Sequence, residues 1–403
     1  MPDRRIRRQQ AASTAHTGMW RTLREICNRN FTVVTLINLL VMTAYYLAFV
    51  TSTSYARQTF GASLSAAGLT AGIMVIGCLL GRFVSGNLLS VFGCKAVLFS
   101  GLLLYLTSMA GFFLVDSLGL LFAQRFWAGV GVIGTATGTI VACVIPQRHH
   151  GFGVSLFSMS TVLALALGPF LGVTLGARMG YASLMRLNVG MALLCALIFF
   201  GLAALPSMRR RHRALFSLNS YIDPRVVRFS LVALAVCPSY GCVQAFMTSF
   251  AAERALSGAA SVFFLLYAAG ALATRPLTGR LFDTRGENII FYPMLLLTAL
   301  SLMLLGRAEN GRTLLLAGLA LGIGFGNFQS VGQAVSLSLV SRSRFAQATT
   351  TFFIFFDMGI GLGPYLFGFL APSMGYGGMY QALALTVLAA LGLYHVLHGR
   401  FAG

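Results

Sequence analysis

Acidic side chains are scarce in this sequence, which has nine aspartate and glutamate residues among 403 and is only 9% charged. A soluble domain is about 25% charged. In contrast, 57% of the residues are apolar, so a soluble fold would expose more apolar surface than water tolerates. The composition therefore excludes a soluble enzyme and an intrinsically disordered protein. It predicts an all-α protein that crosses a membrane several times.

The sequence also lacks the motifs of common membrane enzymes and pumps. It has no H-E-x-x-H, no G-x-S-x-G and no G-x-x-x-x-G-K-[ST], which disfavours an intramembrane hydrolase and an ATP-driven pump. Its seven cysteines are odd in number, lie mostly inside apolar runs, and form neither a disulfide framework nor a metal-type spacing. We therefore expect no enzyme activity, no metal site and no cofactor.

Long apolar runs are what the sequence has in abundance. A helix needs about 20 apolar residues to cross the hydrocarbon layer of a membrane. Twelve such runs predict twelve transmembrane helices, over residues 31–53, 64–91, 95–115, 117–145, 151–177, 183–206, 226–251, 258–282, 287–306, 312–340, 345–372 and 377–398.

Basic residues set the orientation of these spans. A net charge of +20 would suggest a nucleic-acid partner in a soluble chain, but these 29 residues lie mainly between apolar runs, so we expect none. With the N-terminus inside, 22 of the 29 fall at cytoplasmic segments or span ends, as the positive-inside rule predicts, and Arg125 lies within a span. Six face outwards, namely Arg57, Arg178, Arg186, Arg254, Arg307 and Arg312. Both termini are therefore predicted to be cytoplasmic, with no cleaved signal peptide.

The longest polar connection divides the chain into two halves. It contains the basic run 209–213 and falls between the sixth and seventh spans. We therefore predict a basic cytoplasmic tail over residues 1–30, a six-helix bundle over 31–206, a cytoplasmic linker over 207–225 and a second six-helix bundle over 226–399.

The two predicted bundles repeat each other in sequence. Segment 82–93 aligns with segment 275–286 at an offset of 193, and the same offset carries the glycines of span four onto those of span ten. The glycine-proline pair 168–169 matches 363–364 at an offset of 195. Three matches on equivalent spans indicate a duplication. Parallel six-helix repeats enclose a substrate site between the halves, and the halves rock to alternate access.

The repeated segments resemble motifs of the major facilitator superfamily, and the resemblance extends over essentially the whole membrane region. The loop after span two in that family usually reads G-x-L-x-D-R-x-G-R-[RK]; here Ser90 replaces the aspartate, whereas the second copy keeps Asp283. The resemblance implies a cytoplasmic charge latch that the second copy can form. Arg82 and Arg275 are expected to lock helix ends or to snorkel to the interface. The gating candidates are Arg82, Gly86, Gly93, Lys95, Arg275, Gly279, Asp283 and Gly286.

Spans four, five and eleven carry the rest of the resemblance. Segment 124–131 is similar to the family's arginine-glycine motif, segment 166–172 to the glycine-proline motif of its exporters, and segment 355–364 to bacterial efflux members, including arabinose-type and metallophore exporters. This implies a monomeric exporter of a small solute in the bacterial cytoplasmic membrane, driven by proton antiport; a proton-coupled uptake permease is the alternative. The expected hinges, or plain kinks, are Gly168, Pro169, Gly363 and Pro364.

Two charged residues fall inside predicted spans. Asp357 lies twelve residues after Phe345, about 18 Å into span eleven. Arg125 lies roughly 10 Å into span four if that helix starts near Leu118. An ionisable group at such depth is costly and usually faces a cavity or a partner. We therefore predict Asp357 as the proton-coupling residue, with Arg125 as its candidate partner; a packing role is the alternative for each.

Scattered polar residues lie in spans one, seven and ten, which line the central cavity in the family. The resemblance makes them candidates for substrate contacts, and an interhelical hydrogen bond is the alternative for each. They are Asn38, Tyr45, Tyr46, Tyr240, Gln244, Asn327, Gln329 and Gln333.

Overall fold

The computed structural model describes residues 25–132, 134–145, 150–203, 222–341 and 344–400, and all regular structure in these ranges is helical. Eleven of the described helices are long and apolar enough to cross a membrane. The one remaining predicted span, the fourth along the chain (117–145), is formed by α5 (Leu118–Gly131) and α6 (Gly134–Val144) in succession. The prediction of an all-helical protein with twelve spans is therefore confirmed.

The first bundle contains six spans. They are α2 (Arg29–Phe60), α3 (Leu64–Phe92), α4 (Cys94–Gly111) with the 3-10 turn η1 (Phe112–Leu114), α5 with α6, α7 (His150–Met179) and α8 (Tyr181–Phe199). The predicted ends agree to within a few residues, except that α2 continues to Phe60 and carries Arg57 in its last turn. The sixth span ends at Phe199 instead of residue 206.

The second bundle repeats this arrangement. It contains α9 (Pro224–Glu253), α10 (Ser257–Arg285), α11 (Asn288–Gly306), α12 (Gly311–Phe325) with α13 (Phe328–Ser338), α14 (Phe345–Phe367), and α15 (Ala371–Tyr394) with the π-helical turn η5 (His395–Gly399). The predicted basic tail and the predicted linker lie mostly outside the described residues, so the domain boundaries stay a prediction.

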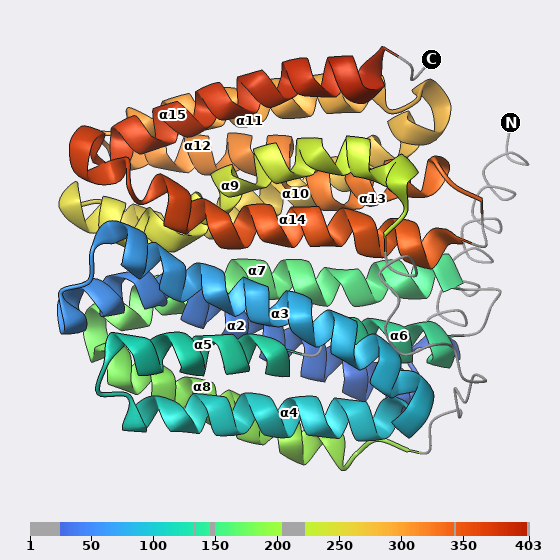
Figure 1. Ribbon diagram of the computed structural model, residues 1–403. Coiled ribbons are helices and arrows are strands. Elements are labelled where there is room, and N and C mark those ends of the chain that lie inside the picture. The colour runs from blue at the N-terminus through green and yellow to red at the C-terminus, as the bar shows by residue number, and fades with distance from the viewer. Residues whose placement is uncertain (1–24, 133, 146–149, 204–221, 342–343, 401–403) are drawn as a thin grey trace, which may run out of the picture.

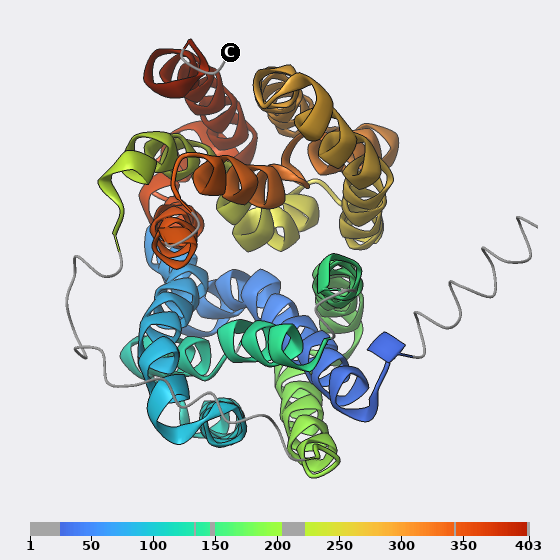
Figure 2. The ribbon, with the colours of Figure 1, turned by 90° about the vertical axis from the view of Figure 1, so that its right-hand side faces the viewer.

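The two bundles lie side by side, and the axes of their helices are roughly parallel. Figure 1 shows α2 to α8 in one group and α9 to α15 in the other, and Figure 2 views both groups along the helices. The first residues of α2 and the last residues of η5 lie at the same end. Following the arginine distribution, we call this end cytoplasmic and the other end outer.

The turns between spans confirm the duplication in three dimensions. Gly93 follows α3 with φ +80°, and Gly286 follows α10 with φ +76°. Gly180, directly before α8, and Gly375, at a kink near the start of α15, form a second pair with φ +74° and +70°. A side chain is strained at such positive φ values, which explains why both copies of the turn carry glycine.

The predicted hinge positions lie where helices approach closely within each bundle. A Cβ atom on Gly168 would lie 2.6 Å from the Cβ atom of Tyr46 on α2, and one on Gly363 would lie 2.6 Å from the Cα atom of Pro238 on α9. Both α7 and α14 continue through the following proline. Glycine is therefore needed at both positions for packing, while their role as hinges stays a prediction.

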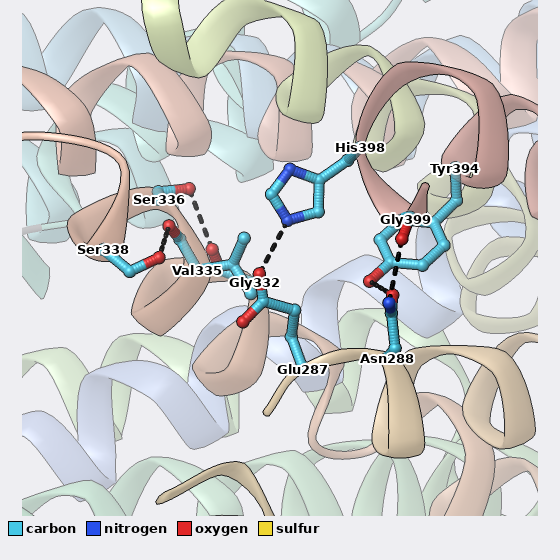
Figure 3. Close-up of polar contacts among 9 residues, drawn as sticks. All are labelled: Glu287, Asn288, Gly332, Val335, Ser336, Ser338, Tyr394, His398 and Gly399. Atoms are coloured by element: carbon cyan, nitrogen blue, oxygen red, sulfur yellow. Dashed lines mark hydrogen bonds and ion pairs between the residues drawn. The ribbon is translucent and has the colours of Figure 1, made fainter. Parts of the chain in front are cut away.

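A polar cluster fixes the end of the last helix at the cytoplasmic side of the second bundle. His398 contacts the Glu287 carboxylate at 2.9 Å, and Asn288 donates a hydrogen bond of 2.8 Å to the Gly399 carbonyl and accepts one of 2.8 Å from Tyr394 (Figure 3). These contacts tie η5 to the start of α11. They lie within one bundle, so they support its rigidity and leave the interface between the bundles free to change.

Candidate functional site

A cavity of about 330 Å³ lies between the two bundles and is lined from both sides. Ligand pockets in proteins measure about 300–1,000 Å³, so this one suits a small solute. Seven of the eight predicted cavity residues line it: Asn38, Tyr45, Tyr46, Tyr240, Gln244, Gln329 and Gln333.

Aromatic rings form much of the cavity wall. Tyr240 stacks on Tyr267 with a centroid distance of 5.1 Å and on Phe325 at 4.8 Å. Tyr45, which occupies the position equivalent to Tyr240 in the first bundle, packs edge-on against Tyr46 at 5.1 Å. All five line the cavity. The wall therefore offers flat apolar faces with hydroxyl groups at their edges, which suits a planar or amphipathic solute.

Two asparagines act as ties between helices. The Asn38 amide donates to Ser160 at 2.9 Å and to Thr161 at 3.0 Å, which joins α2 to α7. Asn327 does not line the cavity: it is 2% exposed and donates to the Ala271 carbonyl and to Thr274. It lies between α12 and α13 and joins them to α10. Asn327, expected in the cavity, therefore lies behind its wall.

Asp357 lies in the cavity wall on α14 and forms an ion pair with Arg82 on α3. Arg82 Nη2 and Asp357 Oδ2 are 3.4 Å apart, and the guanidinium also lies 4.9 Å from the centre of the Phe353 ring. The residue is 8% exposed, and Oδ2 accepts no hydrogen bond from the described residues. The ion pair crosses from one bundle to the other. It therefore depends on the relative position of the two bundles.

Arg275 is the second arginine of the cavity wall and the sequence equivalent of Arg82. Its side chain enters from α10, in the opposite bundle. Within the described part of the chain, the guanidinium of Arg275 has neither an acidic neighbour at ion-pair distance nor a hydrogen-bond partner, whereas its backbone carbonyl accepts a hydrogen bond from Thr278. We expected Arg82 and Arg275 at a cytoplasmic helix end, and both line the cavity instead. The cavity thus carries two arginines and one carboxylate.

Arg125 lies elsewhere, fully buried inside the first bundle. Its guanidinium donates to the Tyr181 hydroxyl and lies 3.8 Å from Met185 Sδ, both on α8. Nε and Nη1 have no hydrogen-bond partner among the described residues. Since Arg82 occupies the place beside Asp357, the expected pairing of Arg125 with Asp357 is not found. Arg125 joins α5 to α8.

The other motif residues that the structure describes, Gly93, Lys95, Gly279 and Gly286, do not line the cavity. Lys95 donates a hydrogen bond of 3.0 Å to the Leu202 carbonyl within the first bundle. Gly279 has open space where a Cβ atom would lie. The environment of Gly86 and the side chain of Asp283 are outside the described part, so the predicted latch stays a prediction. In the described ranges, no three His, Cys, Asp or Glu residues gather as a metal site.

Hydrogen bonds join the two bundles at the outer end. The hydroxyls of Ser54 and Ser249, at equivalent positions 195 residues apart, lie 3.2 Å from each other. Thr248 donates to the Val50 carbonyl at 3.1 Å, and Arg57 donates to the Tyr376 hydroxyl at 2.7 Å. We call this set of contacts the outer closure.

Backbone packing extends the outer closure towards the cavity. A Cβ atom on Gly72 of α3 would collide with the Gly361 carbonyl of α14, and one on Gly68 would collide with that of Pro364. Ala71, between them, is fully buried in an apolar cluster that includes residues of both bundles. In this structure the two bundles are therefore in contact at the outer end, and the path from the cavity to the outside is closed there.

Comparison with known proteins identifies the family. The family model described as Major Facilitator Superfamily matches residues 34–311 and 229–398. The chain belongs to the major facilitator superfamily. Among its curated relatives are an uncharacterized MFS-type transporter of Burkholderia mallei, 23% identical over 86% of each chain, and the uncharacterized MFS-type transporter YhhS of Shigella flexneri, 25% identical over 84% of each chain.

Solved structures of other transporters share the fold. The nucleoside transporter NupG matches with a TM-score of 0.76 at 12% identity, covering 91% of this chain and 98% of that one. A bacterial homolog of the human lysosomal transporter Spinster, in an inward-facing and occupied conformation, matches with a TM-score of 0.78 at 14% identity, covering 92% and 96%. The fold supports secondary transport by alternating access across a membrane.

Sequence reasoning missed the cavity position of Arg82 and Arg275, although helix length contained a signal. The helices α3 and α10 have 29 residues each, so each is about 43 Å long. Arg82 is ten residues before the end of α3 and Arg275 ten before the end of α10, about 15 Å inside. Because each helix is longer than the hydrocarbon layer is thick, a residue that far from its end can lie at the depth of the cavity.

Proposed function

We propose that this chain is a proton-coupled secondary transporter of the bacterial cytoplasmic membrane, that it works as a monomer, and that Asp357 takes up and releases the proton. The supporting observation is the ion pair of Asp357 with Arg82 across the two bundles, at 3.4 Å in the cavity wall. Among the described residues that line the cavity, Asp357 is the one acid. An ionisable residue within the membrane commonly marks the path of an ion or substrate.

Proton coupling is expected because the distance between Asp357 and its partner Arg82 depends on the relative position of the two bundles. An arginine beside a carboxylate favours its charged form, and burial without such a partner favours the neutral form. Rocking the bundles to open the outer end separates α3 from α14, which touch at Gly72 and Gly361. Asp357 would then lose Arg82 as a neighbour in one state and regain it in the other. Protonation and bundle movement are coupled for this reason.

The direction of transport depends on whether protonation of Asp357 weakens or strengthens the binding of the solute in the cavity. Export by antiport, which the resemblance in spans five and eleven implies, needs the two to compete. The charges of this cavity favour the other arrangement. When Asp357 is neutral, Arg82 and Arg275 are two cations without a carboxylate beside them, so the cavity attracts an anionic solute more strongly. For an anionic solute, the charges therefore favour uptake by proton symport over export.

A substrate-free experiment tests the role of Asp357. Ala71→Cys places a thiol in the outer closure, where an impermeant maleimide added outside reacts only when the outer end opens. Lowering the pH should protonate Asp357, break its attraction to Arg82 and increase the labelling rate, measured by mass spectrometry of the peptide. In the Asp357→Asn variant, labelling should be fast at every pH. The matched control is Asp116→Asn, an exposed carboxylate that should leave the pH dependence unchanged.

Two results would overturn the proposal. One is a labelling rate that depends on pH equally in the wild-type background and in Asp357→Asn. The other is a reconstituted Asp357→Asn protein that, once a substrate is known, still concentrates it in proteoliposomes under a pH gradient at the unmodified rate. Exchange of substrate without a gradient should survive the substitution, because exchange needs no net proton movement.

A further inference from the structure

The unpaired arginine of the cavity carries information about the solute. Arg82 and Arg275 are equivalent residues of the two repeats, and both line the cavity. Arg82 has Asp357 at 3.4 Å. Arg275 is half-buried, and among the described residues its guanidinium forms no ion pair and no hydrogen bond. A half-buried guanidinium cannot lose its charge, so it needs an anion, a carbonyl group or water.

The other residues of the wall do not supply that anion. Apart from Arg82, Arg275 and Asp357, the described lining consists of neutral groups: hydroxyls, amides, a thiol and apolar side chains. With Asp357 ionised, the wall carries one positive charge in excess. A low-dielectric cavity amplifies the effect of such a charge on the ligand that enters. One excess cation matches one negative charge on the solute.

The rest of the cavity restricts the body of the solute. Tyr240 stacks on Tyr267 and on Phe325, with centroid distances of 5.1 and 4.8 Å, and these buried rings form an apolar side of the cavity. The volume of about 330 Å³ lies at the lower end of the range for ligand pockets, about 300–1,000 Å³. An aromatic or short aliphatic chain can lie against this apolar side of the cavity.

We propose that the solute is a small organic monoanion whose carboxylate binds Arg275 and whose apolar body lies against Tyr240, Tyr267 and Phe325. This assignment rests on the proposed function, since it names the substrate of the same cavity. Binding and protonation then support each other. A neutral Asp357 neither repels the carboxylate nor holds Arg82, so Arg82 becomes a second donor to the anion.

Cys78 provides a direct readout of cavity occupancy, because it lines the cavity as a free thiol. The full-length protein is purified in detergent, and the alkylation rate of Cys78 is followed by peptide mass spectrometry. Two sets of probes are used, and within each set the apolar body is constant while the end group is an acid, an amide or an amine. The first set is 3-phenylpropionate, its amide and 3-phenylpropylamine. The second is the corresponding hexanoate series. Both acids should slow alkylation of Cys78 at concentrations at which their amides and amines have little effect.

Substitution of Arg275 assigns the contact. Arg275→Gln should raise the half-protecting concentration of the acids by roughly 10- to 100-fold, the usual effect of losing one hydrogen bond to a charged group. Arg275→Lys should recover part of the loss because the charge is kept. The matched control is Arg280→Gln, an exposed arginine of the same helix outside the cavity. In Arg280→Gln, the acids should protect Cys78 at the same concentrations as in the unmodified protein.

The outcomes separate this inference from the proposed function. Better protection by an amine or amide than by the acid, no protection by either acid, or equal loss in Arg275→Gln and Arg280→Gln each overturns the anion assignment. Asp357→Asn should bind the acids at least as tightly as the unmodified protein. If it does so but keeps normal pH-dependent labelling at position 71, proton coupling at Asp357 fails while the anion assignment stands.

Discussion

The ion pair between Arg82 and Asp357 should hold the outer end closed, and its strength can be measured. Arg82→Gln and Asp357→Asn each remove one charge with little change in size. Each should shift the bundles towards the arrangement that is open outside. The double variant should open no more than the single ones, because the second substitution then removes a charge that has already lost its partner.

The magnitude follows from the geometry of the pair. At 3.4 Å, two unit charges attract by roughly 1 kcal/mol in water and by roughly 5 kcal/mol at an effective dielectric constant of 20. The Arg82 side chain is 35% exposed and that of Asp357 is 10% exposed, so solvent screens the pair partly. We expect a coupling of about 2 kcal/mol, which corresponds to roughly a 30-fold change in an equilibrium constant.

The assay is alkylation of Ala71→Cys from outside, in right-side-out vesicles at a pH where Asp357 is charged. Where opening and closing are fast relative to alkylation, the rate is proportional to the open population. Each single variant should therefore label up to roughly 30-fold faster than the parent. Arg280→Gln serves as the control for a change in overall charge. Rates in the single and double variants together give the coupling energy.

Two results would refute this reasoning. Labelling rates of the single variants within about twofold of the parent would mean that the pair does not stabilise the closed arrangement. Effects that simply multiply in the double variant would mean that the two residues act independently, because coupled neighbours deviate from additivity by about 0.5–3 kcal/mol.

Further predictions concern the scaffold. The double variant Ser54→Cys with Ser249→Cys should form a disulfide on oxidation and stop transport until a reductant is added. The cross-link is detected because it holds the bundles together after cleavage at a protease site inserted in the linker. Unimpaired transport in the cross-linked protein would contradict rocking. Gly131→Ala should lower the free energy of unfolding by about 1–3 kcal/mol, since its Cβ atom would lie 2.6 Å from the Tyr105 nitrogen, whereas Gly190→Ala, in open space, should not. Asn327→Ala should lower the free energy of unfolding by about 1 kcal/mol, measured like that of Gly131→Ala by unfolding in SDS; no loss would mean that its two hydrogen bonds contribute nothing.

The sequence predicted the spans well because the physics of crossing a membrane is local. Each span needs a continuous apolar run, and each turn needs a residue that ends the helix, so both are visible in a single stretch of chain. Gly93 and Gly286 are an example: the aligned segments contained both, and the structure gives both a positive φ. The error at the end of α2 arose because Arg57 was treated as a loop residue. In the structure it bonds Tyr376 from within the helix.

The contacts of the charged residues could not be predicted in the same way. The depth of Asp357 follows from counting residues, but its partner depends on which helices of different bundles meet and at what height. Arg125 was the one cation predicted well within a span, and it faces α8. Arg82 appeared to lie near the cytoplasmic surface and faces the cavity. A helix face and a tilt angle decide both outcomes, and neither can be read from one sequence.

The broken symmetry of the repeats explains why charge balance should govern transport. The scaffold is duplicated closely: turns, packing glycines and the serines of the outer closure all occur in pairs. The cavity arginines are also a pair, one from each bundle. The carboxylate is not, because the position equivalent to Asp357 is Val162, which lines the cavity without a charge. One acid for two arginines leaves Arg275 unmatched in the closed state and leaves both unmatched after protonation. A symmetric cavity would hold either two balanced pairs or none, so the single aspartate is the group through which we propose that the proton and the anion are linked.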